Sequence, residues 1–424
     1  MWGTTPKIQN TPSGAARWPR MIALIDMNAF FASLEQLDNP FWRGRPVAVT
    51  NGLRGTCCIT SSYEARAHGV KTGMHLREAR ALCPGLIQAA ARPERYAEVS
   101  TKIMLALQDI CPDMEVFSVD EAFLDLTFCQ KYYKDDPQRI GHLIKHKVFR
   151  ASKLLCSVGI SGDKTTSKWA AKQNKPNGLT IVEPWRSEAV LSQVPVTDLC
   201  GIKKGIGGYL ADRGVHVCGD MKHLPISELA RRFGNPGRRI WFMAQGLDPD
   251  ELHPDVKAPK TMGHGKVIPP DTTDKKVLAM YLMHMAMKVG RHLRKYGYRA
   301  QNFTVMVVSR KHGCLVGKYK TVVPSDDGYK IFDLCADFLE HHYRGEPIWQ
   351  VHVRAMDPKP AELQDDLFMV RDLKRERLNA TIDKINVKYG EFTVCPAPLI
   401  NRSDMPNVIA PSWKPFGHRE SIGY

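Results

Sequence analysis

Hydrophobic and polar positions along the first third of the chain predict a small antiparallel sheet. Met21–Ile25 is a continuous apolar run, which is typical of a buried strand, and Asp26 stands at its end. Residues Glu115–Val119 alternate weakly, and Ala122–Thr127 alternate again. Such a pattern predicts two short strands joined by a tight turn, with Asp120 and Glu121 at the turn.

Segments with the apolar period of a helix precede and follow these strands in the sequence. Residues 21–30 and 92–182 predict the order β–(insert)–αββαβ, which is a ferredoxin-like sheet with helices on one side. Residues 31–91 form the insertion. The helices and strands that complete this prediction are Phe30–Leu37, Pro46–Thr50, Thr56–Thr60, Tyr96–Cys111, Ile140–Leu155 and Cys156–Ile160.

The second half of the chain predicts two more folded parts. Val194–Val217 suggests a helix–hairpin–helix with its loop at Gly201–Gly205. Lys257–Gly265 predicts a linker, and a small α/β sandwich follows. Residues 1–20 and 358–424 are interpreted as tails, the latter with a helix at Leu378–Tyr389. The sandwich elements are Lys275–Tyr296, Phe303–Ser309, Cys314–Lys320, Phe332–His342 and Ile348–Met356. The fold class is therefore α+β and multidomain.

Composition favours a polyanionic partner. The chain has 424 residues, 43% of them hydrophobic, and a formal net charge of +16. Between Lys257 and Lys330 there are fifteen Lys or Arg and four Asp, a net charge of +11. This concentration favours a nucleic-acid-binding module over a generally basic protein, with an anionic membrane as the second choice. No apolar run reaches the length of a membrane span, and the eleven cysteines lack a Cys-x-x-Cys pair, so we expect reduced thiols in a cytosolic protein.

Three carboxylates predict a metal site. Asp26 ends the first strand, and Asp120 and Glu121 lie at the tip of the neighbouring hairpin. Such hard oxygen ligands suit Mg²⁺, and two ions would clamp the attacking and leaving oxygens of a phosphoryl transfer. The alternative for an Asp-Glu pair alone is an ordinary solvated turn.

Basic and aromatic positions near these acids extend the hypothesis. Lys164, Lys168 and Lys172 recur every four residues on one helix face, with Lys175 beyond them. A solvated face is the alternative, but beside an acidic site contact with DNA backbone and triphosphate is favoured. Ser61 or Ser62 would cap a short helix that carries Tyr63 and Arg66, both able to donate hydrogen bonds to a triphosphate.

Four motifs resemble a known family. They are Asp26-Met27-Asn28-Ala29-Phe30-Phe31, Ser62-Tyr63-Glu64-Ala65-Arg66, Ser118-Val119-Asp120-Glu121-Ala122-Phe123 and Lys175-Pro176-Asn177-Gly178. Their order and spacing, from about Met21 to Met356, resemble the bacterial DinB/UmuC group of Y-family DNA polymerases. The resemblance implies a palm (21–30 and 92–182), fingers (31–91), a helix–hairpin–helix thumb (183–256), a linker (257–264) and a little finger (265–357).

The resemblance also implies a low-fidelity, template-directed polymerase that inserts deoxynucleotides opposite damaged bases. It implies two Mg²⁺ ions on Asp26, Asp120, Glu121 and the Met27 carbonyl. Phe31 matches the steric gate against a ribose 2′-hydroxyl. The other positions that match nucleotide contacts are Phe30, Ile59, Thr60, Tyr63, Arg66 and Lys175.

Nucleic-acid and partner contacts follow from the same resemblance. Lys203 stands where the family usually has the second Gly of Gly-x-Gly, which could distort the phosphate-binding turn. Gln364–Phe368, with Gln364, Leu367 and Phe368 as anchors, resembles a sliding-clamp peptide, although more than fifty residues follow it. The expected DNA contacts are Lys164, Lys168, Gly201, Lys203, Lys266 and Arg310.

The expected partners are primer-template DNA, deoxynucleoside triphosphates, the clamp and a further repair protein bound through the tail. We expect a monomer without membrane association, in the bacterial cytoplasm at the nucleoid, acting in the SOS response to DNA damage. The tail resembles UmuC-type proteins, whereas the Lys-Pro-Asn-Gly motif is more like DinB. A non-catalytic, polymerase-shaped accessory protein is the main alternative, and a nucleotidyl cyclase is the second. The three acids, together with Phe31, Tyr63, Arg66 and Lys175, argue against the accessory protein. A cyclase would share the metal-binding acids, but it would not need a hairpin thumb or a module of net charge +11, and an aromatic gate would hinder a ribonucleotide substrate.

Overall fold

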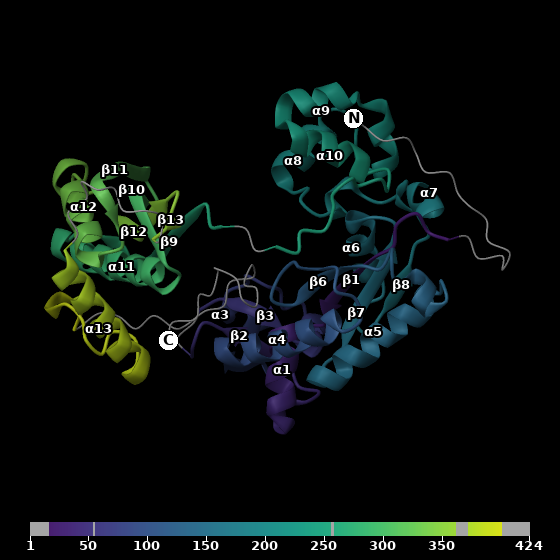
Figure 1. Ribbon diagram of the computed structural model, residues 1–424, viewed down its shortest axis with the longest axis horizontal. Helices are drawn as coiled ribbons and strands as arrows, with labels where there is room; N and C mark the ends of the chain where they lie inside the picture. Colours follow the sequence, from purple (N-terminus) through teal and green to yellow (C-terminus); the bar gives the residue numbers. More distant parts are fainter. Residues whose placement is uncertain (1–16, 54–55, 256–257, 362–371, 401–424) are drawn as a thin grey trace. The chain divides into compact units, whose positions relative to one another are not determined.

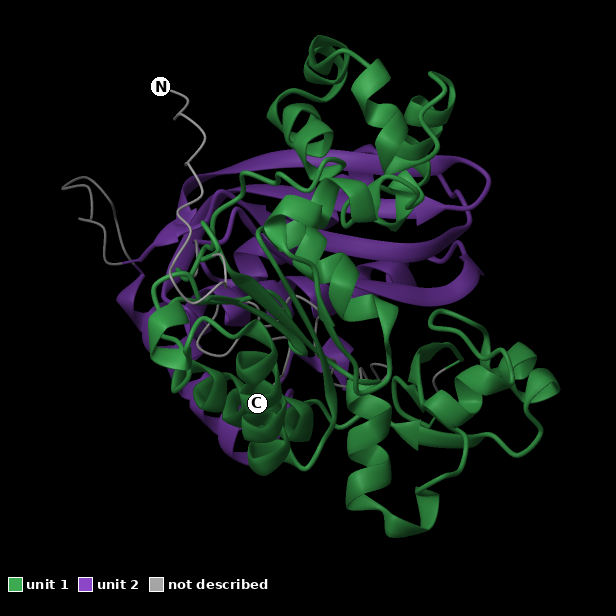
Figure 2. Ribbon diagram, turned by 90° about the vertical axis from the view of Figure 1, so that its right-hand side faces the viewer, with its two compact units in different colours: residues 1–256, 406–422 green, residues 257–405, 423–424 purple. Residues whose placement is uncertain are grey.

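The computed structural model describes residues 17–53, 56–255, 258–361 and 372–400. These residues form two compact units, which divide between residues 256 and 257 (Figures 1 and 2). Each unit has a sheet and a hydrophobic core of its own. Within the described ranges, no helix combines the length and the apolar character needed to cross a membrane.

The main sheet of the first unit has a ferredoxin-like core. Its strand order is β5 (Met114–Val116), β6 (Glu121–Asp125), β1 (Ile22–Met27), β7 (Cys156–Ser161) and β8 (Leu179–Ile181). Each of the first four strands is antiparallel to its neighbour, and β8 is parallel to β7. The ferredoxin-like prediction is confirmed, with β8 as an additional edge strand.

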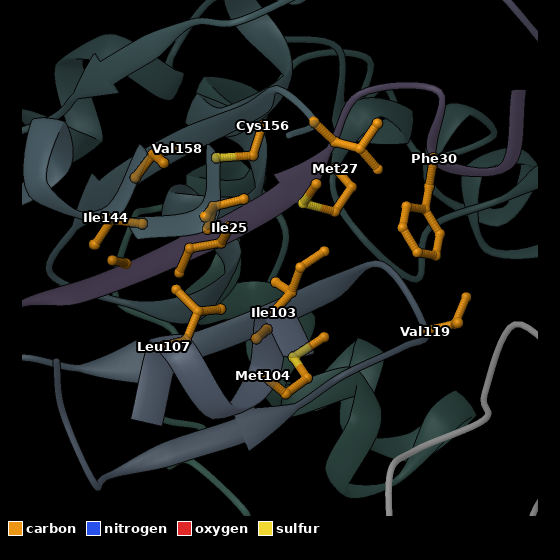
Figure 3. Close-up of a cluster of buried hydrophobic side chains, with 14 of the residues drawn as sticks. Ile25, Met27, Phe30, Ile103, Met104, Leu107, Val119, Ile144, Cys156 and Val158 are labelled. Carbon is orange, nitrogen blue, oxygen red and sulfur yellow. The ribbon is translucent and has the colours of Figure 1, made fainter. Parts of the chain in front are cut away.

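Helices α4 (Pro93–Gln108) and α5 (Pro137–Ser152) cover one face of this sheet. Figure 3 shows Ile25 of β1 among Ile103 and Leu107 of α4 and Ile144 of α5, all of them buried. Apolar side chains recur every three or four residues on both helices, so each presents a continuous apolar stripe to the sheet.

Helix α6 (Lys164–Gln173) covers the opposite face. There Ile22 and Leu24 of β1 pack with Phe123 and with Ala171 of α6. A side chain at Gly159 of β7 would place its Cβ 2.1 Å from a backbone oxygen of α6, so glycine permits the close approach. The expectation of helices on one side only was wrong, because every residue of β1 is buried and the strand is covered on both faces.

The insertion forms a second, three-stranded sheet in the same unit. Its order is β3 (Cys58–Ser61), β2 (Val47–Thr50) and β4 (Ile87–Ala90). The helices of this region are α1 (Phe30–Asp38), α2 (Tyr63–Ala67) and α3 (Leu76–Leu82).

A small helical bundle follows the main sheet. It contains α7 (Ser187–Leu191), α8 (Lys204–Ala211), α9 (Ile226–Phe233) and α10 (Asn235–Met243) around a separate apolar core. The first helix of the expected helix–hairpin–helix is only a 3₁₀ turn, η4 (Val196–Asp198).

Further 3₁₀ turns occur along the described residues. They are η1 (Pro40–Trp42), η2 (Gln130–Tyr133), η3 (Pro184–Arg186), η5 (Cys218–His223) and η6 (Ala397–Leu399).

The second unit is a five-stranded sheet with helices packed against it. Its order is β11 (Gly313–Ser325), β10 (Tyr298–Ser309), β12 (Ile348–Met356) and β9 (Thr261–Thr272), and β13 (Lys359–Pro360) pairs with β10. Its helices are α11 (Lys275–Lys295) and α12 (Gly328–His341), followed by α13 (Leu373–Tyr389).

Two expected tails and the linker need correction. Strand β9 begins at Thr261, inside the expected linker, and pairs with β12. Trp18, expected in a mobile tail, is 5% exposed in the core, and its backbone N–H donates to Gln130 Oε1 at 3.2 Å. Helix α13 begins at Leu373, five residues earlier than expected, and belongs to the second unit.

Candidate active site

The strand register brings the three predicted carboxylates to one end of the main sheet. Asp26 of β1 stands directly opposite Glu121 of β6. Asp120 immediately precedes β6, and its backbone carbonyl accepts the Met27 N–H at 3.0 Å. Glu121 was expected at the turn, but it is the first residue of the strand. The hairpin therefore aligns both acids with the end of β1.

Burial makes these acids costly to ionise. Asp26 is 7% exposed, and burial raises its pKa to about 6, with Lys175 opposing the rise and Glu121 adding to it. Burial also raises the pKa of Asp120, whose carboxylate accepts the Ser118 hydroxyl at 2.7 Å. The cluster therefore needs positive charge to stay ionised near neutral pH.

Two lysines supply that charge. Lys175 Nζ lies 2.5 Å from Asp26 Oδ1, and Lys168 Nζ lies 2.6 Å from Glu121 Oε1. Within the part of the chain that the structure describes, no group of three or more His, Cys, Asp or Glu side chains is arranged to hold a metal ion. The donors are nevertheless carboxylate oxygens with unfavourable mutual charge. They fit a hard divalent cation, which would provide the compensation that the ammonium groups provide here.

The loop that carries Lys175 is fixed to the end of β1. The backbone N–H of Asn177 donates to Asn28 Oδ1 at 2.7 Å, and Asn28 Nδ2 donates to the Ser157 hydroxyl at 2.9 Å. A Cβ at Gly178 would lie 2.2 Å from the Asn174 carbonyl oxygen, so only glycine fits. Asn28 had no predicted role. Its only signal in the sequence is its place inside the first motif.

A stack of aromatic rings holds Phe31. The centre of its ring lies 4.2 Å from the centre of the Tyr96 ring, and the two ring planes are at an angle of 11°. The Tyr96 hydroxyl donates to Glu35 Oε1 at 2.6 Å, and Arg92 binds the same carboxylate. Phe30 is 3% exposed and lies in the core. Sequence reasoning missed Tyr96, because a buried position in the α4 period predicts packing only.

Helix α2 presents Tyr63 and Arg66 as expected. Of the two possible caps, Ser62 accepts the Ala65 N–H. The Arg66 guanidinium lies 5.0 Å from the centre of the Tyr63 ring. The Tyr63 hydroxyl is buried and makes no hydrogen bond of good geometry to a described residue, although Asn28 lies nearby.

Electrostatics connects this helix to the acids. Burial raises the pKa of Tyr63; Arg66 opposes the rise, and the charge of Asp26 adds to it. Tyr63 therefore lies within electrostatic reach of the carboxylate cluster. Ile59 and Thr60, on the adjoining strand β3, are half-buried.

The structure contradicts the assignment of Lys164 and Lys168 to DNA contacts. Lys164 is 4% exposed, and its ammonium lies 2.7 Å from Glu115 and 2.8 Å from Asp250. Lys168 is 8% exposed and holds Glu121. A period of four residues shows that side chains share a helix face, but it does not show whether that face is buried.

The remaining expected contacts lie in loops and in the second unit. Gly201 has a φ of +90°, which favours glycine, whereas Lys203 is extended with a φ of −124° and begins α8 without strain. Lys266 is on β9, and the Arg310 guanidinium lies 5.3 Å from the centre of the Trp349 ring. Gln364–Phe368 lies outside the described residues.

Comparisons with known proteins identify the relatives of this chain. The impB/mucB/samB family matches residues 25–172, and its C-terminal domain matches residues 259–367. A DNA polymerase IV of Moorella thermoacetica is 32% identical, over 88% of this chain and 94% of that protein. Another, of Methanoculleus marisnigri, is 33% identical over 79% and 93%. A solved Y-family DNA polymerase chimera superposes with a TM-score of 0.69 at 25% identity, over 80% of this chain and 99% of that one.

A ferredoxin-like sheet with clustered carboxylates, a helical bundle and a basic sandwich are together the parts expected of a nucleic-acid polymerase. The chain belongs to the impB/mucB/samB family, the Y-family DNA polymerases of the DinB type. It is accordingly a DNA-directed DNA polymerase of the translesion class, with template DNA and nucleotides as substrates and a general dependence on divalent metal. The non-catalytic alternative is not favoured.

Proposed function

We propose that Asp26, Asp120 and Glu121, with the Met27 carbonyl, hold two Mg²⁺ ions during nucleotide addition. The observation that carries this proposal is the register of Asp26 opposite Glu121, with Asp120 next to it. Bound Mg²⁺ supplies Lewis-acid activation of the primer 3′-hydroxyl and neutralises the charge of the triphosphate. The carboxylates orient those charges, and Lys168 keeps Glu121 in place from the side of α6.

Phosphate binding is assigned to a group of donors around the acids. Lys175, Tyr63, Arg66 and Thr60 would bind the triphosphate of the incoming nucleotide. The buried, unsatisfied hydroxyl of Tyr63 supports this role, because a phosphate oxygen would supply the missing acceptor. When a phosphate arrives, Lys175 can exchange its contact with Asp26 for one with the phosphate.

Selection of the sugar is assigned to Phe31. Its ring is held by the stack on Tyr96, so it cannot easily move aside for a 2′-hydroxyl. Phe30 would support the sugar and base from the core, and Ile59 would pack on the new base pair.

DNA contacts are assigned to the α8 loop and to the second unit. Gly201 and Lys203 stand at the N-terminal side of α8, where backbone N–H groups can bind a phosphate. Lys266 and Arg310 of the second unit would add contacts to the DNA backbone.

Further assignments follow from the same function. Gln364, Leu367 and Phe368 would bind a sliding clamp, and the remaining C-terminal residues would recruit a further repair protein. The polymerase would act as a monomer at the nucleoid of the bacterial cytoplasm during the SOS response. The net charge of +16 supports only the association with nucleoid DNA.

Primer extension tests the metal acids. The wild type should extend a primed template with Mg²⁺ and four deoxynucleotides, whereas Asp120→Ala should lose extension by at least about 10³-fold and still bind DNA. The control is Asp109→Ala, which removes an exposed acid at the end of α4 and should leave extension unchanged. Full extension by Asp120→Ala, or a matching loss in the control, would refute the assignment.

A further inference from the structure

Helix α13 docks on the second unit through polar side chains rather than apolar ones. Its inward face repeats at 376, 379, 383 and 386, in steps of three and four residues. Asp383 binds Arg294 of α11 in two hydrogen bonds, at 2.6 and 2.9 Å. Glu376 binds Arg299 at 2.9 Å, and Asn379 and Asn386 are buried. Both acidic residues of the helix therefore point toward the unit.

The chain after α13 continues this docking (Figure 1). The Glu391 carboxylate forms salt bridges with two residues of α11, Lys288 at 2.8 Å and Arg291 at 3.1 Å. Leu399 is fully buried. At the other end of the helix, Arg375 binds Asp327 at 2.9 Å, at the start of α12. Residues 372–400 are therefore a folded part of the second unit, fixed along their whole length.

The outward face of α13 carries only positive charge. Positions 374, 377, 381, 384 and 388 follow one another in steps of three and four residues and share one face of the helix. They are Lys374, Arg377, Thr381, Lys384 and Lys388, and each is exposed. We call the four cations the α13 stripe. None of them forms a salt bridge to a residue that the structure describes.

This separation of charge is unusual for a surface helix. Exposed helices commonly mix lysines with acids three or four residues away, and the pairs neutralise one another. Here Glu376 and Asp383 form ion pairs with Arg299 and Arg294 on the inward face of the helix. They therefore do not neutralise the cations of the stripe. A helix rises 1.5 Å per residue, so the stripe extends over about 21 Å, a length comparable to about six base pairs.

We propose that the α13 stripe binds the phosphate backbone of the DNA on which the polymerase works. The ligand is chosen by charge complementarity: four cations in a row on a docked helix match a linear polyanion, and template DNA, the substrate of the enzyme, is such a polyanion. The contact would lie outside the active site and would read no base sequence, because lysine and arginine contacts to phosphates are independent of sequence. The proposal rests on the DNA polymerase activity, and its test is independent of catalysis.

Salt-dependent DNA binding tests the stripe. The full chain and the variant K374Q/R377Q/K384Q/K388Q would be titrated with a labelled primer-template that has a long duplex arm, over a range of salt concentrations. Each lost phosphate contact lowers the slope of log affinity against log salt by about 0.9. We expect the slope to fall by about two to four and the affinity near physiological salt to fall about tenfold or more. Single-turnover extension at saturating DNA should stay unchanged.

A matched variant separates the stripe from general charge. K134Q/R139Q/R150Q/K153Q removes four exposed cations in and beside α5 of the first unit, and its slope should change by less than about one. If the quadruple variant of the stripe does not fold, K374Q/R377Q and K384Q/K388Q would each be expected to give about half of the effect.

Three results would overturn the proposal. The first is an unchanged salt slope in a folded stripe variant. The second is an equal loss in the α5 variant. The third is stripe-dependent binding to vesicles with an anionic lipid when DNA binding is unaffected, which would assign the stripe to a membrane surface.

Discussion

Single residues of the active site work through the neighbours that hold them. Phe31 is fixed by the ring of Tyr96, and Tyr96 is fixed by Glu35, which Arg92 binds in turn. A rigid ring excludes a hydroxyl better than a mobile one, because a mobile ring can move aside at small cost.

Sugar discrimination should therefore depend on both aromatic residues. Phe31→Ala should raise ribonucleotide incorporation, relative to deoxynucleotide incorporation, by about two orders of magnitude or more. Tyr96→Ala should raise it less, because the gate remains but can move. Tyr96→Phe keeps the stacked ring but loses the hydrogen bond to Glu35, so its effect should be smaller than that of Tyr96→Ala. The measurement is kcat/KM for both sugars with each variant, and equal discrimination in Phe31→Ala and wild type would place the gate elsewhere.

At the residue scale, the sequence predicted well which side chains lie close together where a local pattern determines their position. Asp26, Asp120 and Glu121 lie together as predicted, because a strand end and a tight turn meet at one edge of a sheet. Lys164 was misassigned, because periodicity could not show that its face is buried against Glu115 and Asp250. Tyr96 was missed because its role depends on a contact between elements distant in sequence.

Helix α6 illustrates what one element adds. Lys164 ties it to β5 through Glu115, and to the segment after α10 through Asp250. Asp248 in that segment binds Arg239 of α10 at 2.8 Å and the Thr165 hydroxyl at 2.6 Å. The buried pairs therefore connect the helical bundle to the main sheet.

Lys164→Met should destabilise the first unit by roughly 3 kcal/mol, because it removes the buried ammonium group that neutralises Glu115 and Asp250. The midpoint of urea unfolding measures this. The double variant Lys164→Met/Glu115→Gln should recover part of the loss, since the uncompensated charge is then removed. A single variant as stable as the wild type would mean that the pairs contribute nothing to stability.

A histidine pair joins β9 to α11 in the second unit. His264 Nε2 and His292 Nδ1 lie 3.1 Å apart. Burial lowers the pKa of His292 to about 4, and it lowers the pKa of His264 well below its usual value, with His292 adding to that effect. The charged and titratable groups that act on the pair are His284, Lys288, Arg291, Lys295 and Glu391.

The sign of the pH dependence follows from these directions. Below the ordinary histidine pKa of 6.5 the unfolded chain binds protons that the folded pair does not bind. Stability is therefore complete above about pH 7 and falls as the pH drops toward 4, by roughly 1 kcal/mol for each histidine between pH 7 and 5.5. Hydrogen exchange of the α11 amides measures this loss. A variant with His264→Gln should show a smaller pH dependence, and an equal dependence would exclude the pair as its cause.

The same region shows why strand β9 was not expected. Gly263, Gly265 and the Pro269-Pro270 pair remove the alternation by which a strand is normally predicted. Pairing with β12 determines the structure instead, and the distant strand supplies the hydrogen bonds. Helix α11 was predicted well, because its apolar period is long and regular.

At the scale of the whole molecule, the basic excess is divided between different uses. The charge of +11 over residues 257–330 suggested a single polyanion-binding module. Several of its cations are instead paired with acids after residue 372, namely Lys288, Arg291, Arg294 and Arg299. Net charge thus identified the class of partner correctly, but it could not show which cations face that partner.

The proposed clamp-binding segment, Gln364–Phe368, gives a prediction about the whole polymerase. Gln364, Leu367 and Phe368 are the proposed anchors of this segment, and Asp365 and Asp366 stand between them in the sequence. If the anchors enter a pocket on a sliding clamp, their loss removes most of the binding energy, because a few buried side chains dominate such interfaces. The variant Q364A/L367A/F368A should then shorten the products made with a loaded clamp by several-fold.

Synthesis without the clamp separates this role from catalysis. The triple variant should match the wild type in distributive extension, since the active site is unchanged. D365A/D366A is the matched control, because it alters the same segment but keeps the anchors, and it should retain long products with the clamp. Long products from the triple variant would show that the segment only connects β13 to α13. Short products with both variants would attribute the effect to the charge of the segment rather than to its anchors.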